Sequence, residues 1–345
     1  MSDGMKMSES SVAEPTKQMM QILGGMWVAR MVSVAAELGI ADAIGDGRKT
    51  TEELAAATKT HAPSLYRLLR GLAGANIFRE DEQGMWTGTP LSHVLRSTVP
   101  GSMRSAAIAT MGQEHFAAWG ALTNCVKTGE TGVKHVFGQE IWDYYRENEQ
   151  HAKNFDQCMV DFSVGVNAAL LKAYDFGGID HLIDVGGGHG GVISAVLQQY
   201  PKLRGTLFDQ PYVVDSATRT LELAGVTNRC DRVGGNFFES VPPGADGYLM
   251  KFILHDWDDA RSLTILNCIR RAIAARGKLL VVDIVIPEGN GADWGKLMDV
   301  NMLVMTGGLE RTEKQFRELL GRAGFKLNRV VPTESPLSIV EAVPV

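Results

Sequence analysis

The sequence predicts a mostly helical N-terminal region followed by a doubly wound α/β domain with a mainly parallel sheet. Two observations support this fold class. After Gly178, short apolar runs alternate with helical segments, as in "HLIDVGG", "VISAVLQQYP" and "RGTLFDQP", and this alternation is typical of a parallel sheet wound by helices. A glycine-rich run then follows the first of these strands, "GGGHGG" at residues 186–191. Ligands of such sheets bind at the carboxyl ends of the strands, so we expect a binding site at this loop.

Length and composition limit the classes of function. The chain has 345 residues, of which 45% are hydrophobic and 21% are charged, as in an ordinary globular protein of two or three domains. A net charge of -6 and the absence of a long basic block argue against nucleic acid as a partner. The opening "MSDGMKMSES" lacks the apolar core of a secretory signal, and strings such as "KLLVVDIVIP" are too short to span a bilayer. We therefore expect a cytoplasmic protein.

Cysteine usage points to the same compartment. Cys125, Cys158, Cys230 and Cys268 are widely spaced, with no CxxC pair. They are interpreted as buried thiols in a reducing environment, and neither a zinc site nor a disulfide framework is expected.

The N-terminal residues contain an unusually apolar helix. Residues 1–14 are expected to form a disordered tail, and residues 16–44 have helical composition with apolar side chains on more than one face. A helix that is apolar all round must be buried all round. Two interpretations therefore stay open, a central core helix or a subunit interface. The apolar side chains concerned are Met19, Met20, Ile22, Met26, Val28, Met31 and Val32.

Residues 15–100 are expected to form a winged-helix-like domain. Thr50 and Glu53 have capping-box spacing, and Pro63 suits the first turn of the following helix. A hairpin is then predicted in "REDEQGMWTGTPLS". This shape often binds DNA, but the second helix carries only Arg67 and Arg70, so DNA binding is disfavoured.

The ligand of the glycine loop is open to two interpretations. Gly186, Gly188 and Gly191 match GxGxxG, and Asp209 follows about twenty residues later, as in dinucleotide-binding folds. Asp184, however, lies two residues before the first glycine of the loop. An anionic pyrophosphate favours helix N-terminal N–H groups, and an acid beside it works against binding, whereas a cationic sulfonium cofactor tolerates or favours an acid. Asp184 could equally accept hydrogen bonds from loop N–H groups.

A set of motifs supports the sulfonium cofactor. "LIDVGGGHGG", "FDQP", "GGNFFESVPPGADGYLMKFILHDWDD", "VVDIVIP" and "GGLERTEKQF" occur in an order that resembles the class I S-adenosylmethionine-dependent O-methyltransferases of the caffeic-acid and hydroxyindole type. This family has bacterial members in secondary metabolism, and the resemblance covers nearly the whole chain. It implies a Rossmann-like catalytic domain at residues 174–345, a dimerisation domain at 15–100, and a helical connecting region at 101–173 that lines the substrate pocket.

The resemblance also implies partners and site residues. It implies a homodimer that uses S-adenosylmethionine and yields S-adenosylhomocysteine. No metal is expected, and neither nucleic acid nor a membrane is expected as a partner. Asp209 would bind the ribose diol, Phe237 would lie against adenine and Lys251 would lie beside the cofactor. Asn236 stands where the family has an acid that meets the adenine amino group, and Phe162 replaces a histidine common in the plant enzymes. The full set of expected cofactor residues is Asp184, Gly186, Gly188, Asp209, Gly235, Asn236, Phe237, Lys251 and Ser163.

The catalytic prediction centres on His255, which follows a buried strand in "FILHDWDD". A phenol has a pKa of about 10, so its methylation near neutral pH needs a base. The resemblance assigns His255 as that general base, and histidine has a suitable working pKa. It assigns Asp283 and Glu310 as carboxylates that flank the imidazole and stabilise the imidazolium.

The acids around His255 also suggest a metal site. The alternative is helix capping, because Asp256 and Asp259 have N-cap and N3 spacing before a helix, and this alternative is favoured. Thr312 and Gln315 form another predicted capping box, which places Glu310 in the loop before that helix.

The acceptor is expected to be a small hydroxylated aromatic compound. The side chains expected near it are Phe155, Met159, Asn301, Met302, Met305 and Asp256. Met298, Met302 and Met305 share a helix face, for which core packing is the ordinary interpretation. Alternatives are a C- or N-methyltransferase, a homologue with another reaction, a winged-helix regulator that senses S-adenosylmethionine, and a nicotinamide-dependent dehydrogenase.

Overall fold

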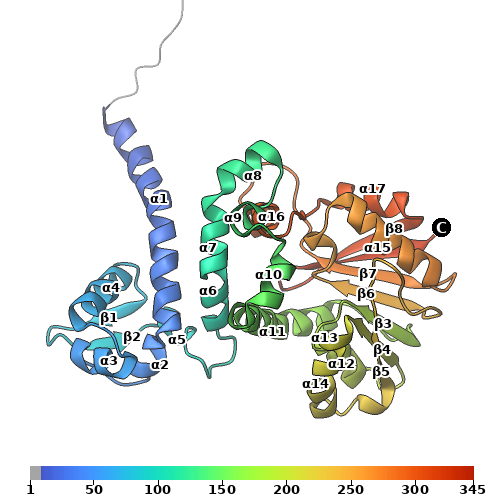
Figure 1. Ribbon diagram of the computed structural model, residues 1–345, viewed down its shortest axis with the longest axis horizontal. Coiled ribbons are helices and arrows are strands. Elements are labelled where there is room, and N and C mark those ends of the chain that lie inside the picture. The colour runs from blue at the N-terminus through green and yellow to red at the C-terminus, as the bar shows by residue number, and fades with distance from the viewer. Residues whose placement is uncertain (1–8) are drawn as a thin grey trace, which may run out of the picture. The chain divides into compact units, whose positions relative to one another are not determined.

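The computed structural model describes residues 9–345 of the chain. It divides into two compact units (Figure 1). The first unit runs to Phe116 and includes Gln150–Asp161, and the second unit holds Ala117–Glu149 and Phe162–Val345. The predicted connecting region, residues 101–173, is helical as expected, but it is shared between both units instead of forming a separate segment.

The first unit contains helices and one hairpin. Its elements are α1 (Glu9–Glu37), α2 (Ile40–Ile44), α3 (Thr51–Thr58), α4 (Ala62–Gly74), β1 (Phe78–Glu80), β2 (Trp86–Gly88), α5 (Pro90–His93) and α6 (Arg104–Thr110). Residues 1–8 of the predicted tail lie outside the described residues, and residues 9–14 belong to α1.

The winged-helix-like shape arises where the sequence predicted it. Thr50 and Glu53 form the reciprocal capping box at the start of α3, and Pro63 lies in the first turn of α4. β1 and β2 pair antiparallel, and the turn between them contains Gly84 at a φ of 75°, a conformation that glycine adopts without strain. Trp86 is fully buried between these elements and donates to the Thr51 hydroxyl (3.0 Å).

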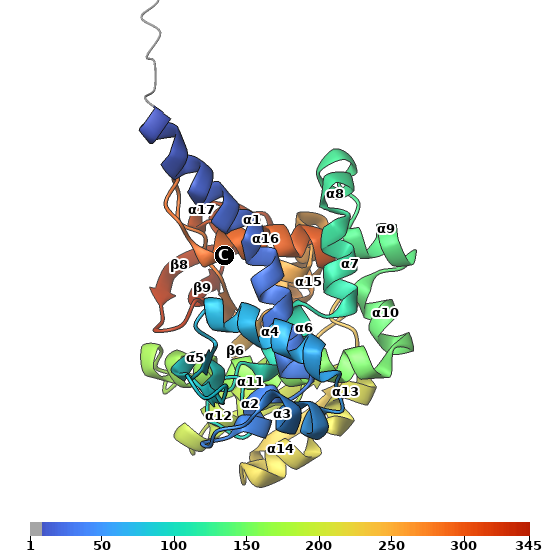
Figure 2. The same ribbon diagram turned by 90° about the vertical axis from the view of Figure 1, so that its left-hand side faces the viewer.

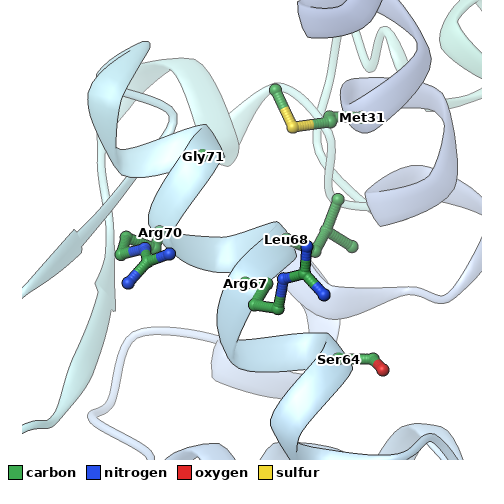
Figure 3. Close-up of a pocket in the computed structure, with 6 residues that line it drawn as sticks. All are labelled: Met31, Ser64, Arg67, Leu68, Arg70 and Gly71. Atoms are coloured by element: carbon green, nitrogen blue, oxygen red, sulfur yellow. The ribbon is translucent and has the colours of Figure 1, made fainter.

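The two halves of helix α1 differ in burial, and the core interpretation of its apolar pattern holds for one of them. Its C-terminal part is core, because Ser33, Ala35 and Ala36 are buried. Its N-terminal half extends beyond α2–α5 (Figures 1 and 2) and exposes large apolar side chains. These are Met19, Met20, Ile22, Leu23, Met26 and Trp27. Within the described part of the chain, Glu14–Glu37 is also the one helix long and apolar enough to cross a membrane by length and composition. This differs from the prediction that the apolar stretches of the chain are too short to span a bilayer.

The second unit is built on a sheet of strand order β5-β4-β3-β6-β7-β9-β8. β3 (His181–Val185), β4 (Arg204–Asp209), β5 (Cys230–Gly234), β6 (Gly247–Lys251) and β7 (Lys278–Asp283) are parallel. β8 (Phe325–Pro332) and β9 (Ser338–Pro344) complete the sheet antiparallel. The predicted doubly wound, mainly parallel fold is thereby confirmed.

Helices cover both faces of this sheet, because alternate strand residues face opposite sides. Leu182 of β3 joins a core with helices α11, α12, α13 and α14, and Ile183 joins a second core with α15 and α17. The helical elements are α7 (Gln113–Gly120), α8 (Leu122–Thr128), α9 (Gly132–Phe137), α10 (Ile141–Glu147), α11 (Glu149–Ala173), α12 (Gly191–Gln199), α13 (Pro211–Ser216), α14 (Thr218–Leu223), η1 (Thr227–Arg229), η2 (Leu254–Asp256), α15 (Asp259–Ala272), α16 (Trp294–Met305) and α17 (Glu313–Arg322).

Candidate active site

The glycine loop between β3 and α12 needs its glycines for backbone reasons. Gly186, Gly188 and Gly190 have φ values of 70°, 57° and 76°, which side-chain-bearing residues rarely adopt. A Cβ on Gly186 would lie 2.3 Å from the Ile253 side chain, whereas one on Gly188 would meet no described atom within 4 Å. The loop therefore packs tightly on one side and leaves its Gly188 backbone accessible to a ligand on the other.

Asp209, at the end of β4, is joined to this loop by hydrogen bonds. Its carboxylate accepts from the backbone N–H groups of Gly188 (2.9 Å) and Gln210 (2.7 Å), and its carbonyl accepts from Gly235 (2.9 Å). Burial raises the pKa of Asp209, and the two N–H groups counteract the rise. Gly186, Gly188, Asp209 and Gly235 thus meet at the carboxyl edge of neighbouring parallel strands, as expected for a ligand site.

Phe237 and Asn236 follow β5 at the same edge. The Phe237 ring lies beside Gly186, since a Cβ on that glycine would be 3.7 Å from it, and its edge packs against Phe238 and Trp257. Asn236 accepts from the Phe238 N–H (3.0 Å) and donates to Glu239 (3.0 Å). Its amide is thus engaged within its own turn, where the family pattern has an acid.

Asp184 is buried beneath the loop, and the half-buried Lys251 interacts with its charge. A Cβ on Gly187 would lie 2.6 Å from the Asp184 carboxyl carbon, and one carboxyl oxygen of this residue has no hydrogen-bond partner among the described residues. Burial raises the pKa of Asp184 to about 7 although Lys251 opposes the rise. Burial also lowers the pKa of Lys251 to about 8, and its ammonium donates to the Ser163 hydroxyl (2.7 Å).

His255 lies in the short turn η2, directly after β6. Its ring is buried and stacks on Phe252 with centroids 5.2 Å apart. The imidazole Nδ1 lies 2.9 Å from Glu310 Oε1, and Nε2 lies 3.8 Å from Asp256 Oδ1. Because Nδ1 faces a carboxylate, the neutral ring carries its proton there, and Nε2 is then the nitrogen that can accept a proton.

The carboxylates control the charge of His255. Burial alone lowers the pKa of this imidazole, but the charges of Asp256, Glu310 and Asp283 raise it to about 10. Burial raises the pKa of Asp283 to about 7 and that of Asp256 to about 6. The titrations of His255 and the surrounding carboxylates are therefore coupled. The carboxylates favour the protonated, imidazolium form of His255.

Two expectations about these acids differ from the structure. Asp283 makes no hydrogen bond to the imidazole; its carboxylate accepts from the Phe252 N–H (3.0 Å), and Asp256 is the acid beside Nε2. Asp256 is also not the N-cap of α15, as its spacing had suggested. Asp258 fills that position and accepts from the Arg261 N–H (2.8 Å), because the chain makes the turn η2 before the helix begins.

The predicted loop position of Glu310 is confirmed. Thr312 and Gln315 form the capping box of α17, and Glu310 precedes it with a buried side chain. Its backbone N–H donates to Asp299 of α16 (2.9 Å). Asp299 was not singled out from the sequence, although it lies on the same helix as the expected substrate residues Asn301, Met302 and Met305.

The expected substrate residues fall in both units. Met302 and Met305 of α16 are buried, and the side-chain amide oxygen of Asn301 accepts a hydrogen bond from the Trp119 indole N–H (3.0 Å). Phe155 and Met159 belong to the first unit, so their approach to the substrate stays a prediction. Among the described residues, no group of three or more His, Cys, Asp or Glu side chains could hold a metal ion.

Comparisons with known proteins agree with this geometry. Residues 119–326 match the O-methyltransferase domain, and residues 20–98 match the O-methyltransferase dimerisation domain. The chain is 44% identical to the phenazine O-methyltransferase PhzM of Lysobacter antibioticus, over 95% of this chain and 96% of that protein. It is 34% identical to the 8-amino-8-demethylriboflavin N,N-dimethyltransferase of Streptomyces davaonensis, over 91% of each chain.

A solved structure shows the ligands of one relative. The O-methyltransferase NcsB1 of neocarzinostatin biosynthesis has been determined with S-adenosylmethionine and 2-hydroxy-5-methyl naphthoic acid. It superposes with a TM-score of 0.81 at 32% identity, and the match covers 92% of this chain and 96% of that one.

The sheet, the glycine loop and the matched domains define a class I methyltransferase with an N-terminal dimerisation domain. The chain belongs to the family of S-adenosylmethionine-dependent O-methyltransferases of secondary metabolism. The residues present fit this cofactor, because the loop leaves Gly188 accessible and the unpartnered oxygen of buried Asp184 suits a positively charged ligand.

Proposed function

We propose that this enzyme methylates a hydroxyl group of a small aromatic compound, with His255 as the general base. The observation that carries the proposal is the contact of His255 Nδ1 with Glu310 (2.9 Å), which leaves Nε2 as the proton acceptor. When bound, S-adenosylmethionine supplies a methyl group on a positively charged sulfur. The bound NcsB1 ligand, a hydroxylated naphthoic acid, supports an acceptor of this class.

The cofactor would be held by residues at the carboxyl edge of the sheet. Asp209 offers a carboxylate to a ribose diol, the Phe237 ring offers a flat surface to adenine, and Gly188 offers accessible backbone. Asp184 acts from beneath the loop, where it supports Gly187 and balances the charge of Lys251.

His255 would take the hydroxyl proton as the acceptor oxygen gains its methyl group. The O–H bond would break, its proton would move to Nε2, and its electron pair would form the new bond from oxygen to the methyl carbon. The bond from that carbon to sulfur would break at the same time and leave its electron pair on the sulfur, which gives neutral S-adenosylhomocysteine. Glu310 holds the ring and stabilises the imidazolium that results. Asp256, beside Nε2, adds further stabilisation, and Asp283 acts through its charge.

The raised pKa of His255 has a direct consequence for activity. A general base must be unprotonated before reaction, and its acids hold the pKa of this imidazole at about 10. Turnover therefore rises with pH across the neutral range, because the unprotonated fraction grows about tenfold for each pH unit below that pKa.

An amine acceptor is the second candidate function. The favouring observation is the 34% identity to a protein named as an N,N-dimethyltransferase. A neutral amine attacks without prior deprotonation, so N-methylation would place less demand on His255. The elaborate carboxylate environment of this histidine favours the hydroxyl acceptor.

His255→Gln tests the proposal. The variant should bind S-adenosylmethionine like the wild type, while turnover of a phenol falls about 10²- to 10⁴-fold. High pH should partly restore it, because solvent then deprotonates the phenol. Asn267→Gln, an exposed amide on α15, is the control. Equal pH–rate profiles of the wild type and His255→Gln would exclude His255 as the base.

The dimerisation domain supports a homodimer, which we propose is formed through the exposed half of α1. A second copy of the chain would cover the exposed apolar side chains of α1, so a membrane is not needed to account for them. The free thiols of Cys125, Cys158, Cys230 and Cys268 support a cytoplasmic location.

A further inference from the structure

We propose that Arg311 is a positioning residue that ties the His255 turn to the Glu310 loop and so sets the geometry of the base. This inference rests on the proposed role of His255 and deepens it. It concerns the second unit alone, in which Arg311 directly follows Glu310 in "GGLERT".

The Arg311 guanidinium bonds the backbone on both sides of His255. It donates to the Leu254 carbonyl (3.0 Å) and to the Trp257 carbonyl (3.0 Å), which bracket the histidine. Arg311 is 1% exposed, and its guanidinium also donates to the Ser262 hydroxyl (3.2 Å) and to the Asp259 carboxylate (2.9 Å). A planar guanidinium has donors in fixed, diverging directions, which the ammonium of lysine lacks.

The Arg311 backbone is joined to a third segment. It forms a parallel bridge with Val285, and its carbonyl accepts from the Ile286 N–H (3.0 Å). That segment follows β7, which ends at Asp283. Arg311 therefore connects the three segments that carry His255, Glu310 and Asp283, and Glu310 is its immediate neighbour in sequence.

Gly308 gives independent evidence that the two loops are in direct contact. A Cβ at this position would lie 1.9 Å from the His255 carbonyl oxygen and 2.6 Å from the Trp257 nitrogen. The Glu310 loop thus lies against the backbone of the histidine turn, and there is no room for a side chain. Since small displacements of a catalytic group lower turnover steeply, this contact can control the rate.

Arg311→Lys tests the inference in the full-length enzyme. We expect kcat to fall about 10- to 100-fold while KM and the Kd for S-adenosylmethionine stay within about twofold. The rising limb of the pH profile should move to lower pH, because a looser Glu310 contact raises the His255 pKa less. Arg270→Lys is the matched control, since Arg270 also donates to two carbonyls, of Gly324 and Val345, away from this turn.

A second pair of variants keeps the test decisive if Arg311→Lys does not fold. Gly308→Ala should give the same loss of kcat and the same movement of the pH limb. Gly321→Ala on α17, where a Cβ meets no described atom within 4 Å, should do neither. In a Glu310→Gln background, Arg311→Lys should add little further loss, because both act through the same contact.

The outcomes separate this inference from the proposed function. Loss of kcat in His255→Gln, with Arg311→Lys and Gly308→Ala matching their controls, would overturn the inference alone. A His255→Gln variant with wild-type turnover would overturn the proposed function. The third outcome is a loss of kcat in Arg311→Lys that adds fully to the loss in Glu310→Gln, while the rising limb of the pH profile stays in place. This outcome would show that Arg311 has a structural role only and would overturn the inference.

Discussion

At the scale of single residues, the charge of His255 is governed by the carboxylates around it. Glu310→Gln removes one of them and keeps the shape of the side chain. We expect the His255 pKa to fall from about 10, so that the rise of kcat/KM with pH occurs at lower pH. The limiting kcat at high pH should also fall, because the imidazolium loses stabilisation. Initial rates from pH 6 to 10 measure both effects.

Glu313→Gln is the matched control for that profile. Glu313 is an exposed acid in the same stretch of chain, and it pairs with Arg317. Its removal should leave the pH limb in place. An unchanged limb in Glu310→Gln would show that Glu310 does not set the His255 pKa.

Asp209 is the residue on which cofactor affinity should depend most directly. Asp209→Ala removes a carboxylate expected to accept charge-assisted hydrogen bonds, which contribute about 1.5 to 3 kcal/mol. The Kd for S-adenosylmethionine should rise about 10- to 150-fold, as measured by calorimetry. The exposed Asp215→Ala is the control, and equal affinities in both variants would contradict the ribose assignment.

The sequence predicted single residues best where a local rule fixes them. The capping boxes at Thr50 and Thr312 are confirmed because each depends on contacts three residues apart. The neighbour of His255 Nε2 was not predicted, since the turn η2 redirects Asp256 from a helix cap toward the imidazole. Arg311 gave no local signal, because its partners are about 50 residues away.

At the scale of elements, the predictable strands were those with a continuous apolar run. β3, β6 and β7 are buried along most of their length, and their pattern is clear in the sequence. β5 and β8 were missed. Both are edge strands, and only one of five side chains in β5 and two of eight in β8 are buried. An edge strand lacks the burial on both faces that makes a strand recognisable in a sequence.

Helix α1 should carry the subunit interface in its N-terminal half. The double change Ile22→Glu and Leu23→Glu places two charges on the exposed apolar surface. Buried like charges cost several kcal/mol across an interface, so the dimer Kd should rise at least about 10²-fold. Sedimentation velocity measures the change. Gln21→Glu, at a polar position of the same turn, is the control and should stay dimeric. A double variant that is still dimeric would contradict the assignment of this half of α1 to the subunit interface.

At the scale of the whole molecule, ligand binding should stabilise the second unit selectively. S-adenosylmethionine at about 100 times its Kd should add about 2.7 kcal/mol, which raises the Tm of a unit of this size by about 5 to 10 °C. S-adenosylhomocysteine should act similarly, and NAD should not. Differential scanning fluorimetry compares all three, and stabilisation by NAD alone would reverse the choice of cofactor made at the glycine loop.

The path of the chain limits how such enzymes can be recombined. Helix α7 begins in the first unit and ends in the second. Helix α11 begins at Glu149 in the second unit, passes through the first unit at Gln150–Asp161 and ends in the second unit, where it supplies Val166 and Leu170 to the core. A single crossover point at residue 116 would therefore separate Gln150–Asp161 from the unit to which it belongs. A chimera that takes its dimerisation region from a relative should inherit that short stretch from the same parent, which makes the two units of this enzyme poor candidates for exchange at a single crossover.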